Sequence, residues 1–121
     1  MTLDRLRVEP DVLACRRTND GVELDLYINA ALAPLAGHFP GLPIVPGVCL
    51  LDWVVHFSKS QLALLQDGAA QIQIKFRRVL QPDRAVTLRL RPLSGGRVKF
   101  DYLDSVAIYA SGTVSPAGAS V

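Results

Sequence analysis

The sequence predicts an α+β domain in which an antiparallel sheet of about five to six strands wraps around one central helix. Two observations predict this architecture. Several runs of residues alternate apolar with polar side chains, which is the pattern of a strand with one buried face. A single long segment, residues 48–66, contains neither proline nor glycine and is typical of a helix. At 121 residues, the chain is expected to form one domain over residues 1–121.

The N-terminal quarter of the chain predicts a hairpin. Residues 12–17 form a short apolar run, and residues 18–21 read Thr-Asn-Asp-Gly, a polar cluster of the kind that makes a turn. Residues 22–28 then alternate apolar with polar side chains. Two neighbouring antiparallel strands are therefore expected.

The central helix is expected to begin at Gly47, directly after Pro46. Its end is predicted near Asp67 and Gly68, because glycine is the usual residue just past a helix C-terminus. Residues 48–57 are apolar almost all the way round, so the helix is expected to be covered on most sides.

Four further strands are predicted in the second half of the chain. They are the alternating runs at residues 71–77, 86–91, 97–102 and 106–110. The breaks between these runs are short enough for antiparallel neighbours. Because one helix must cover the apolar faces of all the strands, the sheet is expected to curl around it.

Composition excludes several classes of protein. The chain carries 13 Lys and Arg against 11 Asp and Glu, and this net charge of +2 is too mild to indicate nucleic-acid binding. Cys15 and Cys49, the only cysteines, make neither a metal cluster nor a disulfide framework. No apolar run reaches membrane-spanning length, and the charged first residues do not resemble a signal peptide. A reduced, cytoplasmic protein without a metal is expected.

One stretch, residues 37–56, concentrates groups that can do chemistry. His38 lies in a loop stiffened by three prolines, which lose little further entropy when the loop is ordered. Gly47 opens the helix, where backbone N–H groups and the positive end of the helix dipole are available. Asp52 interrupts an apolar run, and a carboxylate is rarely placed there without a partner or a task.

Residues 38–52 read His-Phe-Pro-Gly-Leu-Pro-Ile-Val-Pro-Gly-Val-Cys-Leu-Leu-Asp. This run resembles the signature of the β-hydroxyacyl-acyl-carrier-protein dehydratases, which have the hot-dog fold, and residues 74–78 resemble the same family. The triplet at residues 51–53, Leu-Asp-Trp, is most similar to the dehydratases of aryl polyene biosynthesis clusters. The resemblance implies a single hot-dog domain.

The same resemblance implies a lyase. Such an enzyme dehydrates β-hydroxyacyl thioesters on an acyl carrier protein to trans-2-enoyl thioesters, in fatty acid or aryl polyene type biosynthesis. The substrate arrives on the phosphopantetheine arm of the carrier protein, so no cofactor of the enzyme itself is expected. The expected partners are the carrier protein and a second copy of the chain, as a homodimer or a higher assembly of dimers. His38 and Asp52 would then meet across the interface.

Residue types in this stretch suit that chemistry. His38 is the candidate base, because histidine titrates near neutrality, and Asp52 is the candidate acid or holder of the water. Phe39, Gly47 and Val48 are the candidate oxyanion and substrate-binding residues, since a glycine at the helix start lets a thioester oxygen approach backbone N–H groups.

His56 departs from the family pattern, which usually has Gln at this position. His56 lies four residues after Asp52, so both are on one helix face, and a hydrogen bond from His56 would favour the ionised form of Asp52 and compete with its role as acid. A supporting role for His56 is expected rather than a catalytic one. Trp53 and Phe57 are expected in the core, and Cys49 is expected to be an inert buried thiol.

Arg77 and Arg78 are the candidate residues for docking the acidic carrier protein, because they lie in the second segment that resembles the family. Further basic residues at outward-facing strand positions are candidates for the same patch: Lys75, Arg89, Arg91, Arg97 and Lys99. The alternative interpretation of these basic residues, Arg77 included, is a solvated sheet face.

Two other functions remain open. A hot-dog thioesterase shares the fold, although the His-Phe-Pro loop argues against it. A non-catalytic subunit that binds acyl carrier protein is the second alternative, and the presence of both His38 and Asp52 argues against it.

Overall fold

The computed structural model describes residues 9–31 and 44–118. These residues form one helix, six strands and one 3₁₀ turn, in the order β1 (Asp11–Thr18), β2 (Gly21–Ile28), α1 (Gly47–Leu62), β3 (Ala69–Phe76), β4 (Arg84–Pro92), η3 (Ser94–Gly96), β5 (Val98–Leu103) and β6 (Ile108–Pro116). All six predicted strands are present.

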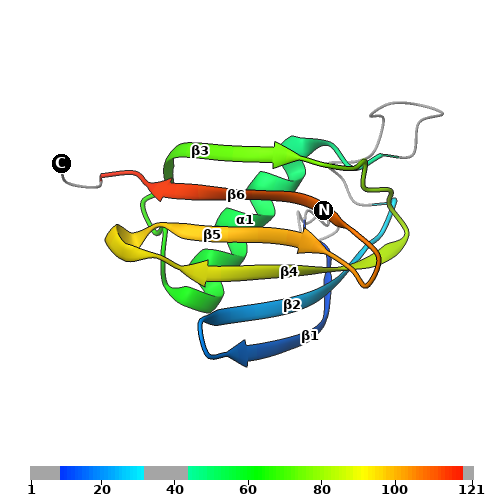
Figure 1. Cartoon of the computed structure of the whole chain (residues 1–121), viewed down its shortest axis with the longest axis horizontal. Helices are drawn as coiled ribbons and strands as arrows, with labels where there is room; N and C mark the ends of the chain where they lie inside the picture. Colours follow the sequence, from blue (N-terminus) through cyan, green and yellow to red (C-terminus); the bar gives the residue numbers. More distant parts are fainter. Residues whose placement is uncertain (1–8, 32–43, 119–121) are drawn as a thin grey trace, which may run out of the picture.

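The strands make one antiparallel sheet in the order β1-β2-β4-β5-β6-β3, so β1 and β3 are its edges (Figure 1). The register brings inward-facing residues together. Leu24 of β2 lies opposite Leu88 of β4, for example, and both side chains are fully buried. The alternation in the sequence therefore predicted the buried face of β2, β4 and β5 correctly. On the edge strand β3, the apolar residues Ile72 and Phe76 are exposed instead.

Helix α1 crosses one face of the sheet, as Figure 1 shows. Trp53 and Phe57 point into the core and are buried, as predicted. The buried Tyr102 hydroxyl on β5 donates a hydrogen bond of 2.6 Å to the Leu50 carbonyl of the helix. This bond satisfies a polar group that would otherwise cost about 1–3 kcal/mol in the core, and it ties the helix to the middle of the sheet.

The helix ends earlier than the sequence predicted. Ala63 adopts a left-handed conformation with φ of 53°, and its N–H donates to the Ser58 carbonyl, which closes the helix after Leu62. Leu65 is also left-handed, and this turn returns its side chain to the core, where it is 3% exposed. Burying a leucine contributes about 1.5–3 kcal/mol. That gain offsets the roughly 1–2 kcal/mol cost of a left-handed non-glycine residue.

Strand β6 extends further toward the C-terminus than the sequence predicted. The sequence predicted residues 106–110, whereas the strand runs over Ile108–Pro116. The second half of the strand lacks a clear alternation of apolar and polar side chains, because it contains small residues. Gly112 is one of them, and the structure requires it there, because a methyl group at this position would collide with the Gln73 carbonyl and lie 2.8 Å from the Phe100 ring.

The outer face of the sheet carries a polar network. Arg16 donates to both oxygens of Asp25 at 2.7 and 2.8 Å, Arg89 pairs with Glu23 at 3.2 Å, and Arg91 pairs with Asp101 at 3.0 Å. The hydrogen bond from Arg16 lowers the pKa of Asp25 to about 2. Arg89 and Arg91 thus belong to the solvated sheet face that the sequence offered as the alternative to a docking patch.

Within residues 9–31 and 44–118, no helix is long and apolar enough to cross a membrane.

Candidate active site

The start of α1 is the part of the predicted site that the structure describes. Gly47, Val48, Asp52 and His56 all lie on this helix. His38 and Phe39 lie outside the described residues, so their predicted roles stay predictions.

The N-terminus of α1 leaves backbone donors available. Pro46 precedes the helix with φ of −61° and ψ of 143°, and no side chain caps the first turn. Its carbonyl accepts the N–H groups of Cys49 and Leu50, at 3.0 and 3.5 Å. The N–H groups of Gly47 and Val48 come before these bonds, outside the intrahelical pattern. This geometry supports the prediction of two donors for a thioester oxygen.

A cavity of about 380 Å³ opens beside these donors. Its lining comes from the residues before the helix, the first helical turn and the segment after β3. The lining residues are Ile44, Val45, Gly47, Leu50, Phe76, Arg77, Arg78, Val79 and Leu80. Most of them are apolar, so the cavity suits an acyl group rather than a polar ligand.

Backbone hydrogen bonds fix the walls of the cavity. The Val45 N–H donates to the Leu80 carbonyl at 2.7 Å, which joins the segment before the helix to the segment after β3. The Tyr109 carbonyl of β6 accepts the N–H groups of Arg77 and Arg78, at 2.8 and 3.2 Å. The cavity is therefore held by ordered backbone on two sides.

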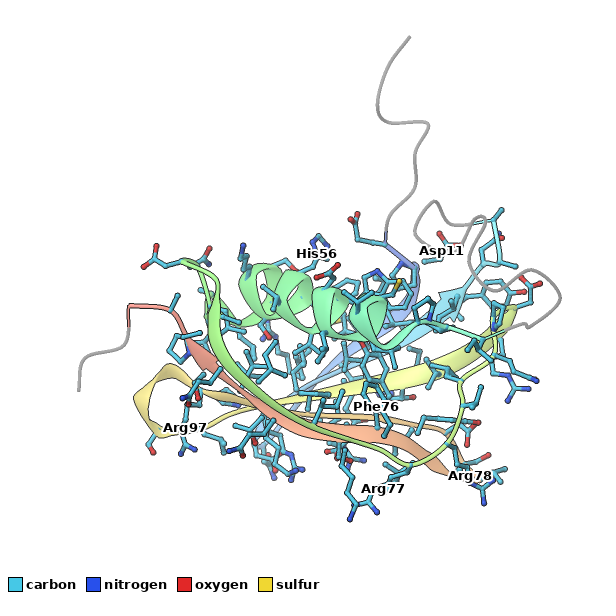
Figure 2. The ribbon with its side chains drawn as sticks, turned by 90° about the horizontal axis from the view of Figure 1, so that it is seen from above. Asp11, His56, Phe76, Arg77, Arg78 and Arg97 are labelled. Atoms are coloured by element: carbon cyan, nitrogen blue, oxygen red, sulfur yellow. The ribbon has the colours of Figure 1, made fainter. Side chains whose placement is uncertain are left out.

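Phe76 is a site residue that the sequence reasoning did not single out. A methyl group at Gly47 would lie 2.6 Å from Phe76 Cζ, so the ring of Phe76 occupies the space beside the helix start (Figure 2). The contact explains why residue 47 is glycine. Two features of the sequence could have indicated this contact: Gly47 stands at the predicted start of the helix, and Phe76 is the last apolar residue in the alternating pattern of β3.

The described residues leave one face of α1 uncovered. Val48 is 62% exposed, Asp52 and His56 are exposed, and Figure 2 shows His56 on the side of the helix away from the sheet. The predicted cover on most sides of the helix is not provided by the described residues, because their sheet packs against only one side of it. Any apolar enclosure of Asp52 must come from outside the described residues.

The expected support of Asp52 by His56 stays a prediction. No hydrogen bond joins the two side chains within the described ranges, and the His56 ring packs edge-on against Phe57, with centroids 4.8 Å apart. Cys49 is buried, and burial together with the nearby Asp52 carboxylate raises the pKa of its thiol. That shift fits an inert role for Cys49.

Arg77 and Arg78 are exposed where the chain leaves β3, and Figure 2 shows both on the side of the sheet opposite the helix. Neither forms an ion pair with a described carboxylate, unlike the arginines of the outer network. Val79 beside them is exposed as well. The segment is free to contact an acidic partner, as the docking prediction requires.

The described residues contain no group of three or more His, Cys, Asp or Glu side chains that can hold a metal ion.

Comparison with known proteins identifies the family. The family model for ApeI dehydratases, ApeI-like, matches residues 14–113. The chain belongs to the ApeI-like dehydratase family. The predicted resemblance to dehydratases is thereby confirmed, and the match is consistent with the aryl polyene branch.

Solved structures agree with this assignment. The chain is 27% identical to a chain of the dehydratase heterocomplex ApeI:P from Xenorhabdus doucetiae, with a TM-score of 0.77 over 88% of this chain and 96% of that one. It is 30% identical to an uncharacterized protein from Erwinia carotovora subsp. atroseptica, with a TM-score of 0.69 over 88% of this chain and 94% of that one. The predicted hot-dog fold is confirmed.

Thioesterases share the fold at lower similarity. Thioesterase superfamily member 2 from Mus musculus is 12% identical, with a TM-score of 0.60 over 82% of this chain and 81% of that one. At this identity the likeness concerns architecture alone. No curated protein sequence matches the chain significantly.

Proposed function

We propose that this protein removes water from β-hydroxyacyl thioesters held on an acyl carrier protein and releases trans-2-enoyl thioesters. One observation supports this most strongly. This chain belongs to the ApeI-like dehydratase family, and at the start of its central helix an apolar cavity lies beside two backbone N–H groups that no other described residue binds. An acyl thioester needs both features, an apolar pocket for the chain and donors for the carbonyl oxygen.

In the proposed reaction, His38 takes a proton from the carbon next to the thioester carbonyl. The electron pair of that C–H bond forms the new double bond, and the C–O bond to the β-hydroxyl breaks. Asp52 supplies the proton with which the hydroxyl leaves as water. Negative charge develops on the thioester oxygen, where the N–H groups of Gly47 and Val48 stabilise it, each by about 3 kcal/mol.

A second hot-dog subunit completes the proposed site. The helix face with Val48, Asp52 and His56 is uncovered, and strand β3 at the sheet edge pairs only with β6 and exposes Ile72. An open edge next to exposed apolar side chains fits pairing with another chain. We propose a homodimer in which His38 of one subunit works with Asp52 of the other. The Xenorhabdus doucetiae relative forms a heterocomplex named ApeI:P, so a different partner chain is the competing outcome.

The carrier protein is proposed to dock at Arg77 and Arg78. Both are exposed, both follow β3 directly, and the same segment lines the cavity. An acidic carrier bound there would deliver its phosphopantetheine arm over a short path, and no cofactor of the enzyme would be needed. The proposed setting is aryl polyene biosynthesis in the cytoplasm, in line with the family.

Labelled water tests the reaction type. Dehydration is reversible, so the protein is incubated with crotonyl carrier protein in oxygen-labelled water. The proposal predicts label in a β-hydroxyl on an intact acyl carrier. Label in a free carboxylate would indicate a thioesterase. No incorporation by the chain alone, with activity restored by a second hot-dog chain, would establish the heterocomplex.

A further inference from the structure

We infer that Phe76 determines which acyl groups the site accepts, by acting as the wall of the cavity beside the thioester-binding donors. The inference rests on the proposed function and adds a specificity residue to it. Phe76 is the last residue of β3, on the helix-facing side of the sheet (Figure 2).

The contact with Gly47 places the ring at the reacting end of the substrate. A methyl group at Gly47 would lie 2.6 Å from Phe76 Cζ and 3.0 Å from Cε1. The ring tip is therefore in van der Waals range of the helix start, where the N–H groups of Gly47 and Val48 are available. Substituents close to the thioester carbonyl must pass this ring.

Phe76 differs from the core aromatics in its burial. Its side chain is 54% exposed, whereas Phe57 and Phe100 are buried. Because the hydrophobic gain grows with the apolar area removed from water, Phe76 contributes less to the core of the described residues than Phe57 and Phe100 do. Phe76 instead presents much of its ring to the cavity and its surroundings.

Phe76 is also the wall residue best able to change the shape of the cavity. It is the one aromatic among the described residues that line it. The aliphatic walls at Val45 and Leu80 are held by their mutual backbone hydrogen bond. The cavity of about 380 Å³ has room for about a dozen water-sized groups, so loss of one phenyl ring changes its capacity substantially.

Two substrates that differ near the reacting carbons test the inference. One is β-hydroxybutyryl carrier protein, and the other is β-hydroxy-β-phenylpropionyl carrier protein, which carries a ring on the β-carbon. The ratio of kcat/KM for the phenyl substrate to that for the butyryl substrate is measured for the wild type, Phe76→Leu and Phe76→Ala. Ile108→Ala is the matched control, since Ile108 lies on the neighbouring strand β6, away from the sheet edge, is exposed and does not line the cavity.

The expected result is a rise of this ratio by about tenfold or more in Phe76→Ala, because a pocket that fits or rejects a few carbons changes selectivity by that order. The ratio for Phe76→Leu is expected to lie between those of the wild type and Phe76→Ala, and Ile108→Ala is expected to keep the wild-type ratio. If Phe76→Ala does not fold, the Phe76→Leu ratio decides, with a rise supporting the inference and an unchanged ratio overturning it.

Other outcomes separate this inference from the proposed function. A wild type that dehydrates, with an unchanged ratio in both Phe76 variants, overturns the inference and leaves the function standing. An equal loss on both substrates in folded Phe76→Ala would show that the ring only positions the helix start, which also overturns it. An equal shift of the ratio in Ile108→Ala would show that the loss of any exposed apolar strand residue has this effect, which overturns the inference as well. A wild type that dehydrates neither substrate overturns both.

Discussion

Replacing Gly47 with alanine separates the packing role of this residue from its proposed catalytic role. The new methyl group would lie 2.6 Å from Phe76 Cζ, so the ring must move by about 1 Å to reach a normal contact distance. Overpacking of this kind costs about 1–3 kcal/mol in an enclosed core. The cost falls at the low end here, because Phe76 is 54% exposed and can swing outward.

A second term opposes that cost. Alanine stabilises a helix by about 0.5–1 kcal/mol relative to glycine. The two terms nearly cancel, so the free energy of unfolding of Gly47→Ala is expected to stay within about 1 kcal/mol of the wild type. In a domain of this size, the thermal midpoint then moves by no more than about 4–8 °C.

The expected effect on catalysis is much larger. The methyl group and the displaced ring would crowd the N–H groups that receive the thioester oxygen, and loss of one such donor lowers kcat by about 10²–10³. The measurements are a thermal unfolding curve and kcat on β-hydroxybutyryl carrier protein. Gly47→Ala combined with Phe76→Leu serves as the control, since it relieves the clash. A kcat of Gly47→Ala within about threefold of the wild type would refute the placement of the oxyanion at this helix start.

Three further predictions follow from the rest of the fold. Gly112→Ala is expected to lower the free energy of unfolding by about 1–3 kcal/mol, measured by urea denaturation, because its methyl group meets the neighbouring strand and the Phe100 ring; a stability equal to that of the wild type would contradict this packing. The pKa of Asp25 is lowered from 3.8 to about 2, so its ion pair stabilises the fold above about pH 4 and is lost as the pH falls toward 2. Asp25→Asn should therefore have a free energy of unfolding about 0.5–1 kcal/mol below that of the wild type at neutral pH. In urea titrations this difference should disappear as the pH falls from about 4 toward 2, and a difference that does not depend on pH would argue against the ion pair. Iodoacetamide is expected to modify Cys15, which is exposed, and to spare the buried Cys49 until the protein is denatured, as peptide mass spectrometry will show; rapid modification of native Cys49 would contradict its burial.

The sheet was predictable from the sequence because its central strands β2, β4 and β5 bury their apolar face. Alternating side chains such as those of residues 22–28 report that burial directly, and the structure has all six strands. The end of the helix was not predictable in this way. Ala63 and Leu65 are good helix formers, and only the tertiary gain from burying Leu65 explains their left-handed backbone.

The site was predictable in its residue types but not in its surroundings. The pattern around Gly47 predicted free donors at a helix start, and the structure has them. It did not predict Phe76 as their neighbour, because the contact joins residues far apart in the chain. It also did not predict the exposure of Asp52, since an apolar helix sequence is the same whether its own sheet or a second subunit covers it.

The most direct test of the account is the intact mass of a β-hydroxyacyl carrier protein after incubation with the purified protein. The account predicts the loss of one water from the carrier-bound acyl group, and it predicts that His38→Ala and Asp52→Asn each abolish this loss while remaining folded. Loss of the whole acyl group, or water loss that persists in both variants, would contradict it.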